Sequence, residues 1–350
     1  MAAVRNVDRG FFPLDRRLQL IEQRSWSPGT IAQALRMGSE IPFARAARQF
    51  EELTHVSISR NSLQRLATEY GGRLVAQQAQ EAQTMVQIPS KEREVVWRER
   101  VEPASDVMNI SMDGAMVNIR EEGWKEVKLV TVSAVRHQLD AETGKAVAHL
   151  SEHSYRAGLW DATEFGQQQW AEACRRGVEN ANYLSSVNDG AAWIWNIVRM
   201  CYGNCVEIID WWHAVEKLWL IAQQRFETES EEATAWVSAQ KQHLITGRLR
   251  TLLHHIRLLY PRGRPLPDDV RNAIFYLFHN RWRMRYHLFR KAGYPIGSGT
   301  VESACKHVVQ QRLKQSGMRW SRLGAQAMLA LRSTLLSQHQ LNPLALLGLT

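Results

Sequence analysis

Hydrophobic residues recur at helical spacing through the first hundred residues of the chain. This spacing predicts three helices, over residues 13–25, 31–37 and 42–53. A fourth helix is expected to begin after Ser59, whose side chain can cap it. Its inward-facing residues would be Leu63, Leu66 and Tyr70.

The start of the fourth helix carries polar and basic residues on the side that the hydrophobic pattern leaves exposed. These residues are Arg60, Asn61, Gln64 and Arg65. A short helix, a tight turn and a helix that begins with such residues are typical of the helix-turn-helix motif. The pattern fits an ordinary helical bundle with a solvated face equally well, so both interpretations stay open.

From about Asp106 the hydrophobic pattern changes to the alternation of period two that is typical of strands. Five strands are expected, over residues 107–112, 117–119, 127–135, 182–187 and 205–209, with a helix over 191–200. Three antiparallel strands followed by α/β units are the order expected of an RNase H-like sheet. The predicted fold is therefore α+β or α/β, with an RNase H-like mixed sheet at its core.

After His213 the pattern is helical again to about Leu259, and a proline-rich loop then separates it from more helix up to Lys291. A glycine-rich break over residues 293–299 precedes the last helical stretch. We expect four parts: an N-terminal helical, helix-turn-helix-like region over 1–104, the first part of the core over 105–213, a helical insertion over 214–292 and the completion of the core over 293–350.

The charge of the chain bears on its partner, and its cysteines bear on its cellular compartment. The 44 Lys and Arg residues outnumber the 35 Asp and Glu residues, which gives a net charge of +9 and favours a polyanionic partner. The four cysteines form no CxxC pair, so we expect the reducing cytosol and no structural zinc site. The sequence contains neither a signal-peptide pattern nor an apolar run long enough to span a membrane.

Two of the expected strands end in the same dipeptide, Asp113-Gly114 and Asp189-Gly190. Asp-Gly after a strand is first of all a turn signal. An RNase H-like sheet, however, brings the ends of its first and fourth strands side by side. Two carboxylates placed there repel each other unless a cation lies between them.

Glu302 is the third acidic candidate, because of the charge around it. Between residues 271 and 335 the chain has twelve Lys or Arg residues, and Glu302 is the only acidic one. A simple alternative is an i,i+4 ion pair with Lys306 on an exposed helix. A DNA-contacting surface that keeps one carboxylate for a metal ion explains the exclusion of other acids better.

Hard divalent cations such as Mg²⁺ or Mn²⁺ take oxygen ligands, and two or three carboxylates suffice to hold them. Two such ions can activate the attacking oxygen and stabilise the leaving oxygen of a phosphodiester displacement. We expect two ions per site, with Asp113 and Asp189 bridging them and Glu302 completing the second site. The Gly297-Ser298-Gly299 stretch lacks the Lys-Ser/Thr of a nucleotide-binding P-loop.

Four ordered segments, residues 111–114, 187–195, 208–214 and 296–303, carry a family resemblance. Together with 312–320, they resemble the motifs of DDE transposases of bacterial insertion sequences, in particular the ISKra type, which is distantly related to Mutator-like enzymes. The resemblance spans about residues 105–335 and implies that Asp113, Asp189 and Glu302 are catalytic and hold the metal ions. It also implies double-stranded DNA partners (transposon ends and target), a homodimer or higher oligomer on DNA, and a cytoplasmic, nucleoid-associated location.

Several residues near these motifs have two possible roles. Asp210 and His213 stand where Mutator-like relatives carry Cys-x-x-His or Asp-x-x-His, so His213 could orient a phosphate or simply pack in the core. Trp193, Trp195 and Trp320 could stack on an unpaired base or belong to the core.

The basic residues of the last segment are expected to hold the DNA backbone. They are Lys306, Arg312, Lys314, Arg319 and Arg322. Two other functions stay open: a transposase-derived protein that binds DNA without catalysis, and an RNase H-like nuclease that cuts without joining.

Overall fold

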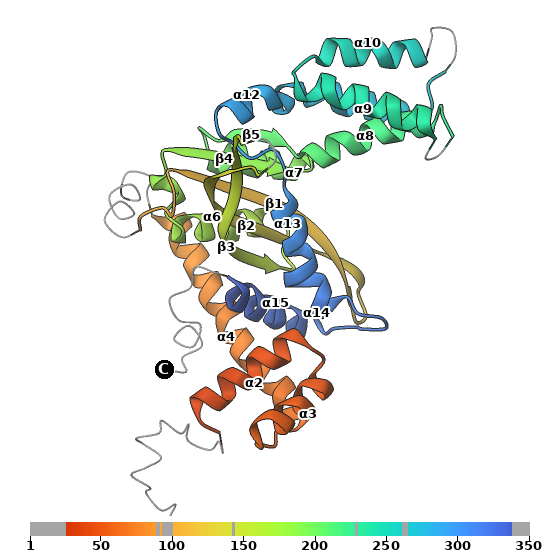
Figure 1. The fold of residues 1–350 in the computed structure, drawn as a ribbon. Helices are drawn as coiled ribbons and strands as arrows, with labels where there is room; N and C mark the ends of the chain where they lie inside the picture. Colours follow the sequence, from red (N-terminus) through yellow and green to blue (C-terminus); the bar gives the residue numbers. More distant parts are fainter. Residues whose placement is uncertain are drawn as a thin grey trace, which may run out of the picture.

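The computed structural model describes residues 26–88, 92, 101–141, 144–227, 230–260 and 265–337. A twisted β-sheet occupies the middle of the molecule, with three helices from the start of the chain at one end and helices α8 to α12 at the other (Figure 1). The helix expected over residues 13–25 lies outside the described residues.

The sheet has five strands in the order β3-β2-β1-β4-β5. Strand β2 runs antiparallel to both β1 and β3, whereas β4 runs parallel to both β1 and β5. The bounds are β1 Val107–Ile119, β2 Gly123–Leu139, β3 Ala146–Gly158, β4 Tyr183–Asn188 and β5 Val206–Ile209. The expected mixture of helices around a mixed sheet is thus confirmed.

The prediction that a strand ends at Asp113-Gly114 was wrong. Strand β1 runs through both residues, pairing them with Leu129 and Lys128 of β2, and the chain reverses only around Glu121 and Gly123, where φ is positive. The two expected strands over 107–112 and 117–119 are therefore one.

A change of hydrophobic phase explains this error. The first half of β1 places Met108, Ile110 and Met112 in one hydrophobic core. Its second half places Ala115, Val117 and Ile119 in another core, on the opposite face of the sheet. Asp113 lies where the buried positions change from even-numbered to odd-numbered residues. In the sequence this break in the alternation resembles a turn between two strands.

Strand β3 was not predicted. It is an edge strand that pairs with β2 alone, with a bulge between Val132 and Ala134. Most of its first eight residues are exposed or half-buried, so it lacks the clear alternation of a strand that covers a core. The three antiparallel strands are therefore β1, β2 and β3.

The first of the two cores joins both ends of the described chain. It holds residues of α2 (Pro28–Glu40), α3 (Phe43–Thr54) and α4 (Arg60–Gln87) together with residues of α13 (Gly299–Ala304) and α15 (Arg322–Leu336). Helices α4 and α15 lie side by side along this face of the sheet (Figure 1). The second core lies on the other face.

The helices that form the second core continue from α6 to α12. Their bounds are α6 Ala162–Arg175, α7 Ala192–Cys201, α8 Trp211–Gln223, α9 Glu231–Ile245, α10 Leu249–Leu259, α11 Asp268–His279 and α12 Tyr286–Lys291. Short helical turns cover Val178–Asn180 (η1) and Arg281–Met284 (η2). The expected strand-helix-strand succession around residues 182–209 is confirmed as β4, α7 and β5.

Helix α4 begins as the sequence predicts. The Ser59 hydroxyl accepts a hydrogen bond from the backbone N–H of Ser62 at 3.0 Å, which satisfies one of the free donors of the first turn. Leu63, Leu66 and Tyr70 are buried, as expected. No helix in the described part of the chain combines the length and the apolar character that a membrane crossing requires.

Candidate active site

Three aspartates lie near one end of the neighbouring parallel strands, Asp113 within β1 and Asp189 and Asp210 directly after β4 and β5. The β1–β4 pairing of Ile110 with Ser186, continued by three residues, places Asp113 beside Asp189. The β4–β5 pairing of Asn188 with Ile209, continued by one residue, places Asp189 beside Asp210. The side chain of Asn188 holds this edge together, since its Oδ1 accepts the N–H of Met112 at 2.7 Å.

Asp113 is a partly buried carboxylate with charged neighbours. Burial raises its pKa above the ordinary value, hydrogen bonds from Gly114 and Cys305 oppose the rise, the negative charge of Asp189 adds to it, and His213 lowers it. Oδ1 accepts the backbone N–H of Gly114 at 2.7 Å. The ionised form is therefore costly at this position until a cation compensates it.

Asp189 does form a turn, as the alternative interpretation held. Its Oδ1 accepts the N–H of Ala191 at 2.8 Å, and Gly190 follows with a φ of 100° that favours glycine. The hydroxyl of Tyr276 donates to the carbonyl of Asp189 at 2.6 Å. Burial raises the pKa of Tyr276, so this hydroxyl stays a donor at neutral pH. The turn uses Oδ1 and leaves Oδ2 for another role.

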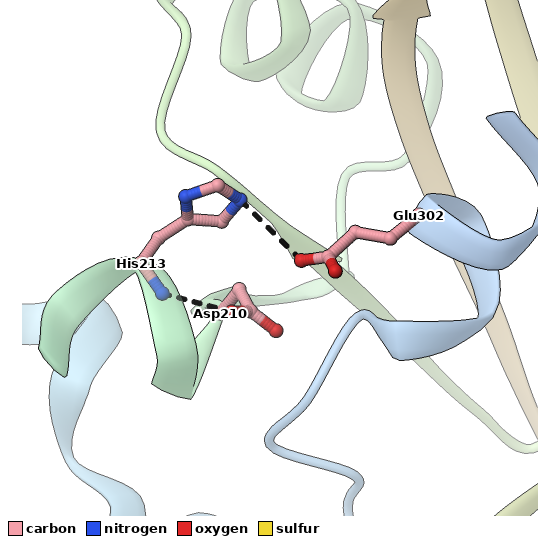
Figure 2. Close-up of side chains that lie close together, drawn as sticks. All are labelled: Asp210, His213 and Glu302. Atoms are coloured by element: carbon pink, nitrogen blue, oxygen red, sulfur yellow. Dashed lines mark hydrogen bonds and ion pairs between the residues drawn. The ribbon is translucent and has the colours of Figure 1, made fainter. Parts of the chain in front are cut away.

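Glu302 reaches the same edge from α13, on the face of the sheet to which odd residues of β1 point. Its side chain is 40% exposed, and its Oε1 lies 3.7 Å from Nε2 of His213. Figure 2 shows the imidazole, at the start of α8, pointing at this carboxylate. Among the described side chains, the carboxylate thus faces His213 rather than Lys306, the partner that the alternative interpretation required.

Asp210 clamps the two segments that carry His213 and Glu302. It is fully buried, and its Oδ1 accepts the N–H groups of Trp212 and His213 at 2.7 and 3.0 Å. Its Oδ2 accepts the N–H of Ser298, just before α13. These hydrogen bonds cap α8 and fix the glycine-rich loop against it.

Asp210, His213 and Glu302 offer ligand atoms that lie within 4.8 Å of one another, the only such group among the residues described. Both oxygens of Asp210 already accept backbone hydrogen bonds, so we interpret Asp210 as a positioning residue. Asp113 and Asp189 lie outside this compact group. Asp189 and Glu302 each have a carboxylate oxygen that accepts no backbone hydrogen bond, and Asp113 beside them is bonded only to Gly114 and the Cys305 thiol. We therefore interpret these three as the residues that could hold a metal ion.

Cys305 is a neighbour of the site that sequence reasoning missed. Its thiol is hydrogen-bonded to Asp113, and burial raises its pKa, so it stays protonated. It begins a π-helical segment, η3 (Cys305–Gln310), which leads through the short α14 (Gln311–Leu313). Its position three residues after Glu302, on the same side of the helix, was the available sequence signal.

The tryptophans near the motifs are largely packing residues. Trp195 and Trp320 are only 3% and 9% exposed, so base stacking by these two is contradicted. Trp193 is half-buried and packs edge-on against Phe165 at 5.6 Å. Trp212, which is 57% exposed and adjacent to His213, was not singled out in the sequence.

The residues expected to contact DNA divide into exposed and buried ones. The exposed residues are Arg60, Asn61, Gln64, Arg65, Lys306, Lys314, Arg319 and Arg322. Arg322 forms a two-point ion pair with Glu122 at 2.9 and 2.6 Å. Arg312 is 1% exposed, which contradicts the expectation that it lies on an open DNA-binding surface. Its guanidinium packs against the rings of Phe43 and Trp320 instead.

A comparison with protein-family models finds no match for this chain, and a comparison with curated proteins finds none either. The functional argument therefore depends on the geometry and chemistry of the residues described above.

Proposed function

We propose that the chain is a DDE-type DNA transposase that cuts and joins phosphodiester bonds with the help of divalent metal ions, on an RNase H-like core. The observation that carries this proposal is that three carboxylates share neighbours at one end of the parallel strands. Asp113 in β1 lies near Asp189, which directly follows β4, and both His213 and Cys305 neighbour Asp113 as well as Glu302. Glu302 arrives 113 residues after Asp189 on a separate helix. The strand order, with three antiparallel strands followed by two parallel ones, supports the RNase H-like assignment.

The residues fit a hard divalent cation such as Mg²⁺. All the proposed ligands are carboxylate oxygens. Burial raises the pKa of Asp113, and the negative charge of Asp189 adds to the rise, so a cation between the two would relieve their repulsion. Bound ions would polarise the phosphodiester and favour the attacking oxygen as a nucleophile. Asp113, Asp189 and Glu302 would hold them.

The remaining residues keep these carboxylates in place. Tyr276 and Asn188 fix the backbone around Asp189, and Asp210 fixes the loop that leads to Glu302. His213 directs its Nε2 toward Glu302, a contact that would orient the carboxylate. Such outer contacts restrict the rotamers of the ligands.

A DNA substrate agrees with the distribution of charge. Glu302 is the single acidic residue among twelve Lys or Arg residues between positions 271 and 335. At the far end of the molecule, the first turns of α4 expose Arg60, Asn61, Gln64 and Arg65 beside two shorter helices. We assign this end to DNA binding, in a helix-turn-helix-like arrangement.

The test is a cleavage and strand-transfer assay with labelled duplexes that carry the ends of the mobile element, in Mg²⁺. Wild type should cut and join, and Asp189→Asn should lose both by orders of magnitude while it still binds the duplex, because Asn keeps the hydrogen bond to Ala191 but loses the charge. Asp161→Asn is the matched control, since Asp161 caps α6 through a similar contact with Glu164.

Other outcomes would favour the two alternatives. Cutting without joining by the wild type would indicate a nuclease. Binding without any Mg²⁺-dependent cutting would indicate a protein that only binds DNA. Early melting of Asp189→Asn, with Asp161→Asn unaffected, would show that Asp189 serves the turn alone.

A further inference from the structure

A cavity of about 290 Å³ lies between the N-terminal helices and the loop that precedes α15. Four arginines line it, and none of its lining residues is acidic. The four are Arg60 at the start of α4, Arg120 at the tip of the β1–β2 hairpin, Arg312, and Arg319 in the loop. Like charges that converge in this way repel one another, so the cavity favours an anion.

Arg312 forms the floor of this cavity and has an unused donor. Its guanidinium lies 4.7 Å from the ring centroid of Phe43 and 5.0 Å from that of Trp320. Nε donates to the carbonyl of Gly38 at 3.1 Å, but Nη2 has no hydrogen-bond partner. Burial, and secondly the charge of Arg332, lower the pKa of Arg312 to about 10, so it remains a cation at neutral pH.

The wall opposite the N-terminal helices is held by backbone hydrogen bonds. Trp320 donates its N–H to the carbonyl of Asn118 at 3.1 Å and accepts the N–H of Arg120 at 2.8 Å. The indole of Trp320 donates to the carbonyl of Leu313 at 3.2 Å. The hairpin tip and the loop are therefore fixed to each other, so this wall of the cavity is held by the fold itself.

We propose that this cavity binds a phosphate group of a DNA backbone, so that α4 and the loop before α15 grip one strand together. Guanidinium groups match phosphate oxygens in geometry, and Arg60, Arg120 and Arg319 are exposed at the mouth, where a strand can continue in both directions. The inference rests on the proposed function only in taking DNA as the ligand.

The position of Arg312 gives the cavity a second role. Arg312 follows Glu302 by ten residues, on the helical run of α13, η3 and α14. A phosphate in the cavity would therefore lie near a buried cation that belongs to the segment carrying Glu302. Binding there would help to order this segment relative to the sheet.

The proposal can be tested by fluorescence anisotropy of a labelled duplex with the full chain, in EDTA so that nothing is cut. Arg120→Gln and Arg319→Gln should each weaken binding roughly tenfold and lower the slope of log affinity against log salt by about one. Arg73→Gln is the control, since Arg73 lies on α4 outside the cavity and pairs with Glu69 at 2.9 Å. It should bind almost as wild type does.

Wild-type affinity and salt slope in both cavity variants would overturn the proposal. So would a thermal stabilisation by inorganic phosphate that Arg120→Gln abolishes while DNA binding stays unchanged, because the site would then serve a free anion. If the wild type shows no Mg²⁺-dependent cleavage but the cavity variants still lose DNA binding, the transposase proposal fails and this inference stands. If the wild type cleaves and the cavity variants bind DNA normally, this inference fails and the transposase proposal stands.

Discussion

The imidazole Nε2 of His213 lies 3.7 Å from Oε1 of Glu302, although helices α8 to α12 separate the two residues along the chain. Asp210 supports this contact, because it accepts the N–H of His213 in the first turn of α8 (Figure 2) and also the N–H of Ser298 in the loop before α13. The side chain of His213 is 29% exposed and faces a carboxylate, so it is not a fully buried core residue.

His213→Gln should reduce Mg²⁺-dependent cleavage by about 10–100-fold, the usual effect of removing a residue that orients a metal ligand. The Mg²⁺ concentration for half-maximal cleavage should rise as well, which a purely structural role would not cause. His279→Gln is the control, because His279 is exposed on α11 and stacks on Phe275. Unchanged Mg²⁺ dependence in His213→Gln would assign the histidine to packing.

Asp113→Asn should stabilise the metal-free protein at pH 7. Burial, with the neighbouring Asp189, raises the folded-state pKa of Asp113 above 3.8. The carboxylate therefore costs stability as the pH rises above 3.8, and the cost is complete once the pH exceeds the folded-state pKa. Each kcal/mol relieved should raise Tm by roughly 2–4 °C. The difference from wild type should shrink as the pH falls toward 3.8, where the unfolded chain also binds the proton.

With Mg²⁺ present, wild type should become more stable than Asp113→Asn. Added Mg²⁺ should raise the Tm of wild type and of Asp161→Asn, but should raise that of Asp113→Asn much less, since one ligand has lost its charge. Equal stabilisation of all three proteins would mean that the ion binds somewhere else.

Two adjacent glycines in α4 should respond to alanine in opposite directions. A Cβ at Gly71 would lie 2.4 Å from the carbonyl oxygen of Ala327 in α15, and a Cβ at Gly72 would meet nothing within 4 Å. Gly71→Ala should therefore separate the two helices and destabilise the protein by about 1–3 kcal/mol. Gly72→Ala should stabilise it by about 0.5–1 kcal/mol. Urea denaturation measures both, and an unchanged or increased stability of Gly71→Ala would contradict the close approach.

Glu172 is the centre of a buried ion-pair network. Its carboxylate lies 2.6 Å from Arg175 and 3.5 Å from the buried Arg156. Glu172→Ala should cost about 3–5 kcal/mol of unfolding free energy, because Arg156 would lose its buried partner. Glu164→Ala, an exposed change on the same helix, should stay within about 0.5 kcal/mol of wild type.

The cost of removing Glu172 should depend on pH. Burial tends to raise the pKa of Glu172, but Arg175 and Arg156 lower it below 4.5. The stabilisation is therefore complete above 4.5 and is lost as the pH falls through the folded-state pKa. Urea midpoints of wild type and Glu172→Ala that stay equally far apart as the pH falls would contradict this prediction.

Local signals in the sequence predicted much of this fold. The Ser59 cap, the buried face of α4 and the short hydrophobic strands β4 and β5 depend on neighbouring residues alone. The acidic candidates stood out because of their neighbours in sequence, namely a strand end for Asp189 and a surplus of cations for Glu302.

The remaining features depend on contacts between distant segments. Arg312 looks like a surface cation in its basic stretch, and only Phe43 and Trp320 draw it inward. Strand β3 lies at the sheet edge and shows weak alternation, so β2 determines its conformation. Tyr276 reaches Asp189 from 87 residues away, and no pattern around either residue announces that hydrogen bond.

The first core, which joins α4 to α15, also bears on how the chain folds during synthesis. Ile31 and Leu35 leave the ribosome early, yet they belong to the same core as Met328 and Leu331, which are made roughly 300 residues later. Until α15 emerges, helices α2 to α4 lack much of the apolar surface that buries them in the finished protein. A chain stopped before α15 would leave this face uncovered, and the nascent protein would need protection from aggregation until translation ends.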